Sequence, residues 1–382
     1  MKRHKVQWRA AVLLSVLLLA ASSCAFSGSG GGKTGTGRKE SGENPSVSIM
    51  TWNMQALFDG TETGGEYDEY REAAGWSSEK YLGRLNSITG AVGTMESAPD
   101  IIAIQEIESV RVLNDLTAAL SKYGYTWSHF AGNSGMSLGL GILSRFPLGA
   151  IKIHSISVDG ETVPRPVLET RVSADGGEIA LFVCHWKSKL GGGEATEAAR
   201  RASARIILRR IRELAEKEPD LPVIVLGDLN ENYDEFYRQN GAAISALLPD
   251  DPRSADLAGL YESGGEENAR TDELQKDFFI ISKDKPPQSR YFPPETVALY
   301  SPWFGELENG SYYYKNEWET IDHFLLSGQL FNDSGWEFEN SAVVDYPPFT
   351  NNSGYPAAYN PRTGSGLSDH LPLLLFLKYR GL

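Results

Sequence analysis

Apolar and polar positions follow two different periods along the chain. Short apolar runs rich in β-branched residues predict strands, and longer stretches with an apolar position roughly every 3.6 residues predict helices. The strands are expected at residues 46–52, 101–105, 139–143, 150–157, 167–172, 179–185, 223–226, 323–326 and 371–375. The helices are expected at residues 81–95, 109–122 and 196–218.

Strand and helix patterns interleave along the chain, which is typical of the α/β class. Glycine turns and short hairpins in the middle of the chain favour a mixed sheet over a wholly parallel one. Residues 231–318 are poorly periodic and rich in proline, aspartate and aromatic residues. We expect loops and short elements in that region.

Residues 1–24 have the pattern of an export signal. Four basic residues precede an apolar run at residues 10–21, and two serines then precede Cys24. The run is too short for a comfortable transmembrane helix. A cysteine after small residues resembles the lipobox of bacterial lipoproteins. We therefore expect a lipid on Cys24 that anchors an exported protein to the membrane of the cell envelope; cleavage as a plain secretory signal is the alternative.

A segment rich in glycine and serine at residues 25–46 predicts a flexible tether before a domain at residues 47–382. The 382-residue chain is long enough for a large core. Its formal net charge of -14 repels nucleic acid globally but permits local basic patches and bound cations. Cys184 is the one cysteine besides Cys24, so the mature domain has neither an internal disulfide nor a cysteine zinc site.

Several predicted strands begin or end in polar residues that a core does not need. Strand ends in an α/β sheet meet at one edge, where ligands bind. Carboxylate and amide oxygens without cysteine suit a hard divalent cation, Mg²⁺ or alternatively Mn²⁺ or Ca²⁺. Histidine beside carboxylates suits proton transfer or stabilisation of a developing anion, so the set indicates a phosphoester hydrolase. The polar residues are Asn53, Gln55, Gln105, Glu106, His185, Lys187, Asp228, Asn230, Asp322, Asp369 and His370.

The motifs TWNMQ, IQE, GLGILSRFP, HWKSK, GDLN, IDHFLLS and SDHLP, in this order, resemble those of the endonuclease/exonuclease/phosphatase superfamily. Deoxyribonuclease I and the apurinic endonucleases are members. The motifs span Thr51 to Pro372. The resemblance implies an α/β fold of four layers, in which two mixed β-sheets pack face to face with helices outside. It also implies one site at the top of that sandwich.

The resemblance assigns metal and water roles to some of the polar residues. Glu106 in IQE matches the principal metal ligand, with Asn53 beside it, and Asp369 is a candidate ligand or support. Asp228 in GDLN matches the residue that orients or deprotonates the attacking water, and Asn230 matches a contact of the phosphate or the metal site. We expect Gly227 to let the backbone pass close to the metal and the phosphate.

Other residues match contacts with the phosphate. His185 in HWKSK matches a histidine that hydrogen-bonds the scissile phosphate. His370 in SDH matches a second histidine that faces the phosphate, and Asp322 in IDHF matches its orienting partner. Arg165 in RPVLET falls where several members have an arginine that contacts the phosphate.

The predicted helix at residues 196–218 suggests nucleic acid as the substrate. Residues 185–215 hold eight lysines or arginines and three glutamates, in a chain that is acidic elsewhere. We expect Lys187 and Arg200 to contact substrate phosphate. A flank of Arg201, Arg205, Arg209 and Arg212 predicts a track for the phosphate backbone, and a solvated helix face is the alternative.

Other functions remain open at this stage. Gln55 stands where apurinic endonucleases usually carry a carboxylate, which argues against repair of abasic sites, as does export. Sphingomyelinase and inositol-phosphate phosphatase relatives share the core, and aromatic residues at 303–318 would suit a lipid headgroup. A non-catalytic adhesion lipoprotein is the third alternative, although the intact polar strand ends argue against it. The sequence indicates no protein partner.

Overall fold

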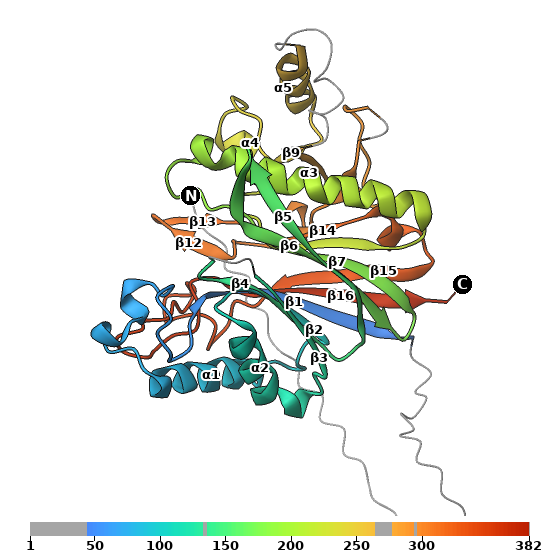
Figure 1. The fold of residues 1–382 in the computed structure, drawn as a ribbon. Coiled ribbons are helices and arrows are strands. Elements are labelled where there is room, and N and C mark those ends of the chain that lie inside the picture. The colour runs from blue at the N-terminus through green and yellow to red at the C-terminus, as the bar shows by residue number, and fades with distance from the viewer. Residues whose placement is uncertain (1–43, 133–135, 264–276, 294–295, 382) are drawn as a thin grey trace, which may run out of the picture. The chain divides into compact units, whose positions relative to one another are not determined.

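The computed structural model describes residues 44–132, 136–263, 277–293 and 296–381 (Figure 1). The predicted signal segment with Cys24 and nearly all of the predicted tether lie outside the described residues. The folded unit runs from Asn44 to Leu382. Within the described ranges, no helix is both long and apolar enough to span a bilayer.

The first sheet has six strands and contains one parallel pair at its centre. Every other pair in this sheet is antiparallel. The order across the sheet is β15 (Gly335–Val343), β16 (Leu373–Arg380), β1 (Ser46–Leu57), β2 (Ile101–Ile107), β4 (Gly139–Ser144) and β3 (Trp127–Ala131).

The second sheet has eight strands and is also mixed. Its order is β5 (Leu148–Val158), β6 (Glu161–Ala174), β7 (Gly177–His185), β8 (Val223–Asp228), β14 (Asp322–Leu326), β11 (Ala298–Tyr300), β10 (Phe279–Ser282) and β9 (Leu247–Pro249). A separate antiparallel hairpin consists of β12 (Tyr312–Tyr314) and β13 (Glu317–Glu319).

Three helices cover the outer faces of the sheets. The helices α1 (Ser78–Val92) and α2 (Val110–Ala119) lie against the first sheet, and α3 (Gly193–Lys217) lies against the second (Figure 1). Ser77 and Ser109 cap α1 and α2, because their side chains accept hydrogen bonds from backbone N–H groups of the first turn. Two further helices, α4 (Glu235–Arg238) and α5 (Pro252–Ser263), follow β8 and β9.

The period of two along each strand produces the layers. Ile49 on β1 and Leu181 on β7 belong to a core between the sheets. Their neighbours Met50 and Phe182 point the other way, into the cores under α1 and α3 respectively. The predicted fold class, two mixed sheets packed face to face with helices outside, is therefore confirmed.

Each strand and helix predicted from the sequence overlaps an element of the structure. The apolar pattern missed β3, β15 and the strands β9 to β13. The strand β3 lies at a sheet edge and leaves most of its residues partly exposed, so its alternation is weak. The strands β9 to β13 have three or four residues each, too few to establish a period. The described residues between 231 and 318 form loops and short elements, as predicted, with α5 as the one longer element among them.

Gly227 lies at a close approach between two neighbouring strands. Its φ is +127°, and a Cβ atom there would lie 2.0 Å from the carbonyl oxygen of Cys184 on β7. No other residue type fits that position without moving the backbone. The neighbouring strand is therefore enough to explain the glycine, and the approach of a metal and a phosphate to this backbone stays a prediction.

Arg84 of α1 is a fully buried cation that holds the end of β1. Gln55 and Ala56 both have positive φ, so β1 bulges there and turns carbonyl groups out of the ladder. The Arg84 guanidinium donates hydrogen bonds to the carbonyl oxygens of Met54, Gln55 and Ala56, and to that of Leu367. These bonds give a charged donor to buried carbonyl oxygens, of which that of Ala56 also accepts from the Phe58 N–H and that of Gln55 from the Tyr70 hydroxyl.

We expect Arg84→Met to destabilise the fold by about 3–5 kcal/mol, because several buried carbonyl oxygens lose the hydrogen bond of a charged donor together. The thermal unfolding midpoint, followed by circular dichroism, measures the loss. The control is Arg209→Met on α3, where the arginine side chain is 67% exposed. Equal midpoints for the two variants would contradict the role given to Arg84.

Candidate active site

The register of the second sheet places three predicted site residues side by side. In the parallel pair β7 and β8, His185 lies opposite Asp228. In the antiparallel pair β8 and β14, Asp322 lies opposite Asp228. Residues opposite each other point to the same face of a sheet. The three side chains therefore form a row at one end of the sheet, and all are almost fully buried.

Asn53 on β1 connects the first sheet to this row of side chains. Its Nδ2 donates a hydrogen bond of 3.0 Å to Oδ2 of Asp228, which joins the ends of the two sheets. Its Oδ1 accepts a hydrogen bond of 2.9 Å from the backbone N–H of Gln55. Both ends of the Asn53 amide are thus fixed by partners in the chain.

Glu106 projects from a bulge at the end of β2. Its φ of 62° is uncommon for a residue with a Cβ and marks a constrained position. Oε2 accepts a hydrogen bond of 2.8 Å from the backbone N–H of Ala56, and Oε1 lies 3.6 Å from Nε2 of His185. The side chain is 21% exposed, so Glu106 faces the buried row from its accessible side.

The Asp228 carboxyl lies where its charge is disfavoured. Burial raises its pKa, and the charge of Asp322 raises it further, while His370 and hydrogen bonds from Asn230 and Asn53 oppose the shift. Its Oδ1 accepts a hydrogen bond of 2.9 Å from the backbone N–H of Asn230. A carboxyl with a raised pKa is suited to take a proton from water near neutral pH.

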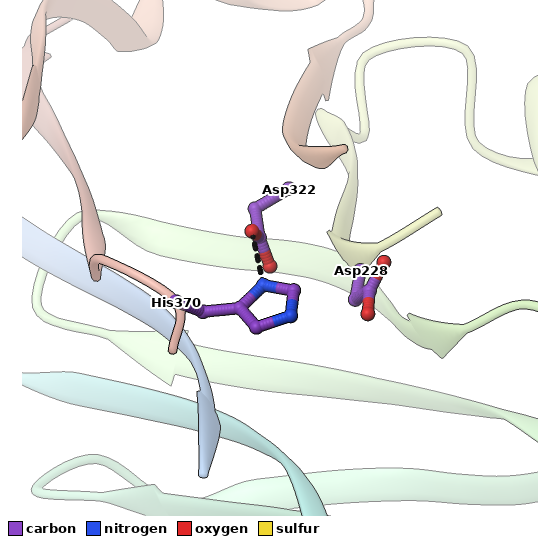
Figure 2. Close-up of side chains that lie close together, drawn as sticks. All are labelled: Asp228, Asp322 and His370. Atoms are coloured by element: carbon purple, nitrogen blue, oxygen red, sulfur yellow. Dashed lines mark hydrogen bonds and ion pairs between the residues drawn. The ribbon is translucent and has the colours of Figure 1, made fainter. Parts of the chain in front are cut away.

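His370 and Asp322 form a buried pair (Figure 2). Nδ1 of His370 lies 2.7 Å from Oδ2 of Asp322, which also accepts a hydrogen bond of 2.6 Å from Oγ of Ser311. Burial lowers the pKa of the imidazole, but the charge and hydrogen bond of Asp322 outweigh burial and raise the pKa of His370 to about 10. At neutral pH the ring is therefore an imidazolium, and its second N–H is turned toward Asp228 (Figure 2).

His185 has the opposite charge state. Burial and the charge of Arg165 lower the pKa of His185 well below its ordinary value, so the ring is neutral. Nδ1 lies 2.5 Å from Nη1 of Arg165. Because arginine only donates, Nδ1 is the acceptor and Nε2 carries the proton. That N–H lies 3.5 Å from Oδ2 of Asp228 and 3.6 Å from Oε1 of Glu106.

Asn230 and Lys187 lie at the rim of this row. Asn230 has a φ of 53°, and its Nδ2 donates a hydrogen bond of 3.1 Å to the carbonyl oxygen of Trp186. Asn230 thus holds the turn after β8 against the end of β7, while its contact with a phosphate or metal stays a prediction. Lys187 is half-buried, and its charge helps to lower the pKa of His185.

Asp228, Asp322 and His370 present ligand atoms within 4.8 Å of one another, which resembles a metal-binding group. A metal ion there would have to displace the proton that the raised pKa of His370 favours. An imidazolium has no free lone pair, and its Nδ1 is already bound to Asp322. We therefore interpret these three residues as a proton-holding group.

Glu106 and Asp369 fit a cation better. Burial raises the pKa of Asp369, and the charge of Glu106 raises it further, so two carboxylates repel each other at the accessible side of the row. A divalent cation with oxygen ligands relieves such repulsion. The donor set expected from the sequence, Glu106 with Asn53 and Asp369, therefore suits a hard cation.

The structure does not bring Arg200 to this site. Its side chain is 1% exposed, and its guanidinium donates to Oε1 of Glu231 at 2.7 Å and to Oε2 of Glu197 at 2.6 Å. The predicted contact between Arg200 and a substrate phosphate is corrected, because a guanidinium enclosed by its own carboxylates cannot reach a ligand.

The arginine flank of α3 is also engaged within the chain. Arg201 lies 2.9 Å and Arg205 lies 3.1 Å from Asp277, and Arg209 lies 3.9 Å from Glu213. Arg201 and Arg205 share one carboxylate, so these ion pairs offset only part of the charge of the flank. The phosphate track expected from the sequence stays a prediction.

Two serines that the sequence did not single out support the site. Ser368 accepts a hydrogen bond of 3.1 Å from the backbone N–H of His370 and donates one of 2.7 Å to the carbonyl oxygen of Asn53. Ser311 donates to Asp322. Ser368 is the serine of the SDH motif, so the motif could have pointed to it. Ser311 lies in a stretch with no periodic apolar pattern, so no signal in the sequence points to it.

Similar folds occur in solved structures of low identity. A protein of the endonuclease/exonuclease/phosphatase family from Bacteroides thetaiotaomicron is 17% identical with a TM-score of 0.51, over 88% of this chain and 96% of that one. A mannosyl-6-phosphatase from the same species is 16% identical with a TM-score of 0.49, over 87% of this chain and 100% of that one. TDP2 from D. rerio, complexed with a single-strand DNA product, is 14% identical with a TM-score of 0.49, over 87% and 99%.

No curated protein sequence matches the chain. The sequence profile described as the Endonuclease/Exonuclease/phosphatase family matches residues 48–262, which is more than half of the chain. The matched stretch contains the strand ends that carry Asn53, Glu106, His185 and Asp228. The chain therefore belongs to the endonuclease/exonuclease/phosphatase family, whose members hydrolyse phosphoester bonds.

Proposed function

We propose that this protein is a divalent-metal-dependent hydrolase of phosphodiesters. The observation that carries the proposal is the convergence of both sheets on one buried polar row, where Asn53 is hydrogen-bonded to Asp228 beside the Asp322–His370 pair. A family of phosphoester hydrolases and a site of this composition point to the same chemistry.

Glu106, with Asn53 and Asp369 beside it, would hold the cation. A bound divalent ion supplies charge neutralisation and polarises the phosphoryl oxygen, so that an anionic substrate tolerates attack by water. Mg²⁺ is the ion we expect, with Mn²⁺ or Ca²⁺ as alternatives, because every proposed ligand atom is an oxygen.

Asp228 orients the attacking water and accepts its proton. Two hydrogen bonds, from Asn53 and from the Asn230 backbone, fix the carboxylate, so that its position does not depend on the substrate. Its raised pKa makes it a better proton acceptor than an ordinary aspartate.

The two histidines and Arg165 stabilise the phosphate. His370 donates a charged hydrogen bond as negative charge develops on the phosphoryl oxygens, and Asp322 keeps its ring protonated. His185 donates a neutral N–H from Nε2, and Arg165 adds a positive charge directly behind it. These donors are positioned before the substrate arrives, which avoids the cost of reorganising them during the reaction.

Nucleic acid is the substrate that we propose, in the form of a single or unpaired strand. Carboxylates of the chain pair with Arg200, Arg201 and Arg205 of α3, which weakens this helix as a basic surface for a long duplex. Contact with phosphate then falls to Arg165 and Lys187 at the site itself. The same observation favours a second candidate, a small phosphoester such as an inositol phosphate, which needs no track at all.

We expect Asp228→Asn to lower kcat by about 10²–10⁴, because the amide cannot accept the proton of water. Hydrolysis is measured on single-stranded DNA, duplex DNA, RNA, sphingomyelin and inositol phosphates, each with Mg²⁺, Mn²⁺, Ca²⁺ or EDTA. The control is Asp220→Asn at an exposed turn before β8. EDTA should abolish turnover. Hydrolysis that persists in EDTA would exclude the metal, and an inert wild-type protein would favour the adhesion alternative.

We expect Asp322→Asn to move the alkaline limb of the pH profile to lower pH. The carboxylate raises the pKa of His370 to about 10, so in the wild type the protonated donor is present below that pH and is lost above it. Without the charge, burial lowers the pKa of His370, and only the smaller contributions of Asp369 and Asp228 oppose it. Profiles of kcat/KM from about pH 5 to about pH 11 test this shift. The exposed Asp345→Asn serves as the control, and the same alkaline limb in both variants would refute the pairing.

We also propose that the enzyme is exported and anchored to the cell envelope through a lipid on Cys24. The support is the sequence of residues 1–24 alone. We expect Cys24→Ser to move the protein from the membrane fraction of the expressing cells to a soluble exported fraction, as seen by immunoblotting after fractionation. The variant Cys184→Ser keeps Cys24 and should stay with the membrane; release of both or of neither would contradict the anchor.

A further inference from the structure

The hairpin of β12 and β13 has two faces with different surroundings. Lys315 and Asn316 form its turn, and both have positive φ, as in a two-residue type I′ turn. Residues on each strand alternate between faces. The register places Tyr313 opposite Trp318 on one face. On the other face Tyr312 lies opposite Glu319 and Tyr314 lies opposite Glu317.

The first face attaches the hairpin to the rest of the fold. The ring of Tyr313 stacks on that of Tyr355 with centroids 3.9 Å apart, and it lies 5.3 Å from the ring of Trp318. A two-stranded hairpin is marginally stable by itself in water. These aromatic contacts therefore stabilise the hairpin by packing it against the rest of the fold.

The second face begins at a catalytic residue. The ring of Tyr312 lies 4.6 Å from the imidazole of His370, at an angle of 31°. Tyr312 and His370 also form an isolated antiparallel bridge. Tyr314 continues outward, with its ring 6.1 Å from that of Tyr312 and inclined by 21° to it. Tyr314 as a residue is 48% exposed, so a strip of nearly parallel rings leads from His370 to solvent.

The strip suits a planar ring better than a phosphate backbone. Every nucleobase has a π-face that stacks on an aromatic side chain, whatever its sequence. The carboxylates of Glu317 and Glu319 share this face, where they accept hydrogen bonds from exocyclic amino groups. The ammonium of Lys315 lies over the Tyr314 ring, 5.0 Å from its centroid, so a cation already rests on a π-face of the strip. The strip starts beside His370, which contacts the scissile phosphate in the proposed function. The nucleoside bonded to that phosphate is therefore the part of the substrate that reaches the strip.

We propose that Tyr312 and Tyr314 form a stacking surface for the unpaired nucleobase next to the scissile phosphodiester. This inference rests on the proposed hydrolase function, because it takes His370 as the contact of the phosphate. The base lies on the strip with its amino edge toward Glu317 or Glu319. Such a surface selects unpaired strands over duplex, since a paired base does not expose its face.

Equilibrium binding in EDTA tests the surface independently of turnover. The probes are two fluorescent single strands of about eight nucleotides, one with adenine bases and one with abasic tetrahydrofuran sugars throughout. We expect Tyr314→Ala to raise the Kd for the adenine strand about five- to a hundredfold and to change the Kd for the abasic strand less than about twofold. Tyr314→Trp keeps the ring and should bind the adenine strand at least as tightly as the wild type.

The control is Tyr291→Ala, a tyrosine that is 51% exposed elsewhere on the surface, which should change neither Kd. An unchanged Kd for the adenine strand in Tyr314→Ala would overturn the stacking surface. Equal losses for the two strands would also overturn it, because they would indicate a contact with sugar or phosphate. If base-dependent binding is found and no phosphodiester is cleaved, the surface stands and the proposed hydrolase function fails.

Discussion

The hydrogen bond from the Asn53 amide to the Asp228 carboxylate is the point on which the site depends. It joins the end of β1 in one sheet to the end of β8 in the other, with 3.0 Å between Nδ2 and Oδ2. Both side chains are almost fully buried, so either partner alone would be left with an unsatisfied polar group. Asp228 is also the cross-strand neighbour of His185 and Asp322. The packing of the two sheets therefore determines the position of the whole row.

Charge at the site is set by neighbours rather than by residue type. Two buried histidines lie in the same row, yet His370 beside Asp322 holds its proton to about pH 10, while His185 beside Arg165 loses it. The result is one charged donor and one neutral donor around a single carboxylate. An arriving phosphate meets both, and it brings negative charge to a region where the carboxylates already repel one another. In the proposed function, a cation at Glu106 would be the electrostatic complement of this arrangement.

The sequence predicted the parts of the site that lie at strand ends. Asn53, Glu106, His185, Asp228 and Asp322 each follow or open an apolar run, and the structure gathers them because strands of a sheet end at one edge. Contacts that depend on tertiary pairing were not predictable. A helical wheel places Arg200 on one face of α3, but only the folded structure shows that Arg200 pairs with Glu231 on that face. Likewise, β12 is three residues long, so its apolar pattern cannot reveal that Tyr312 lies against His370.

The buried Arg200 of α3 supports the turn that follows β8. Glu231 comes directly after Asn230 in the turn that follows Asp228, and its buried carboxylate accepts from Arg200 and from the backbone of Leu247. An unpaired carboxylate would be costly at that depth, so the arginine is needed to keep the turn folded. The same turn presents the backbone N–H of Asn230, which donates a hydrogen bond to Asp228 and fixes its carboxylate. Arg200 thus supports the position of Asp228 from inside the fold, through Glu231 and the turn, and its own charge is enclosed by carboxylates of the chain.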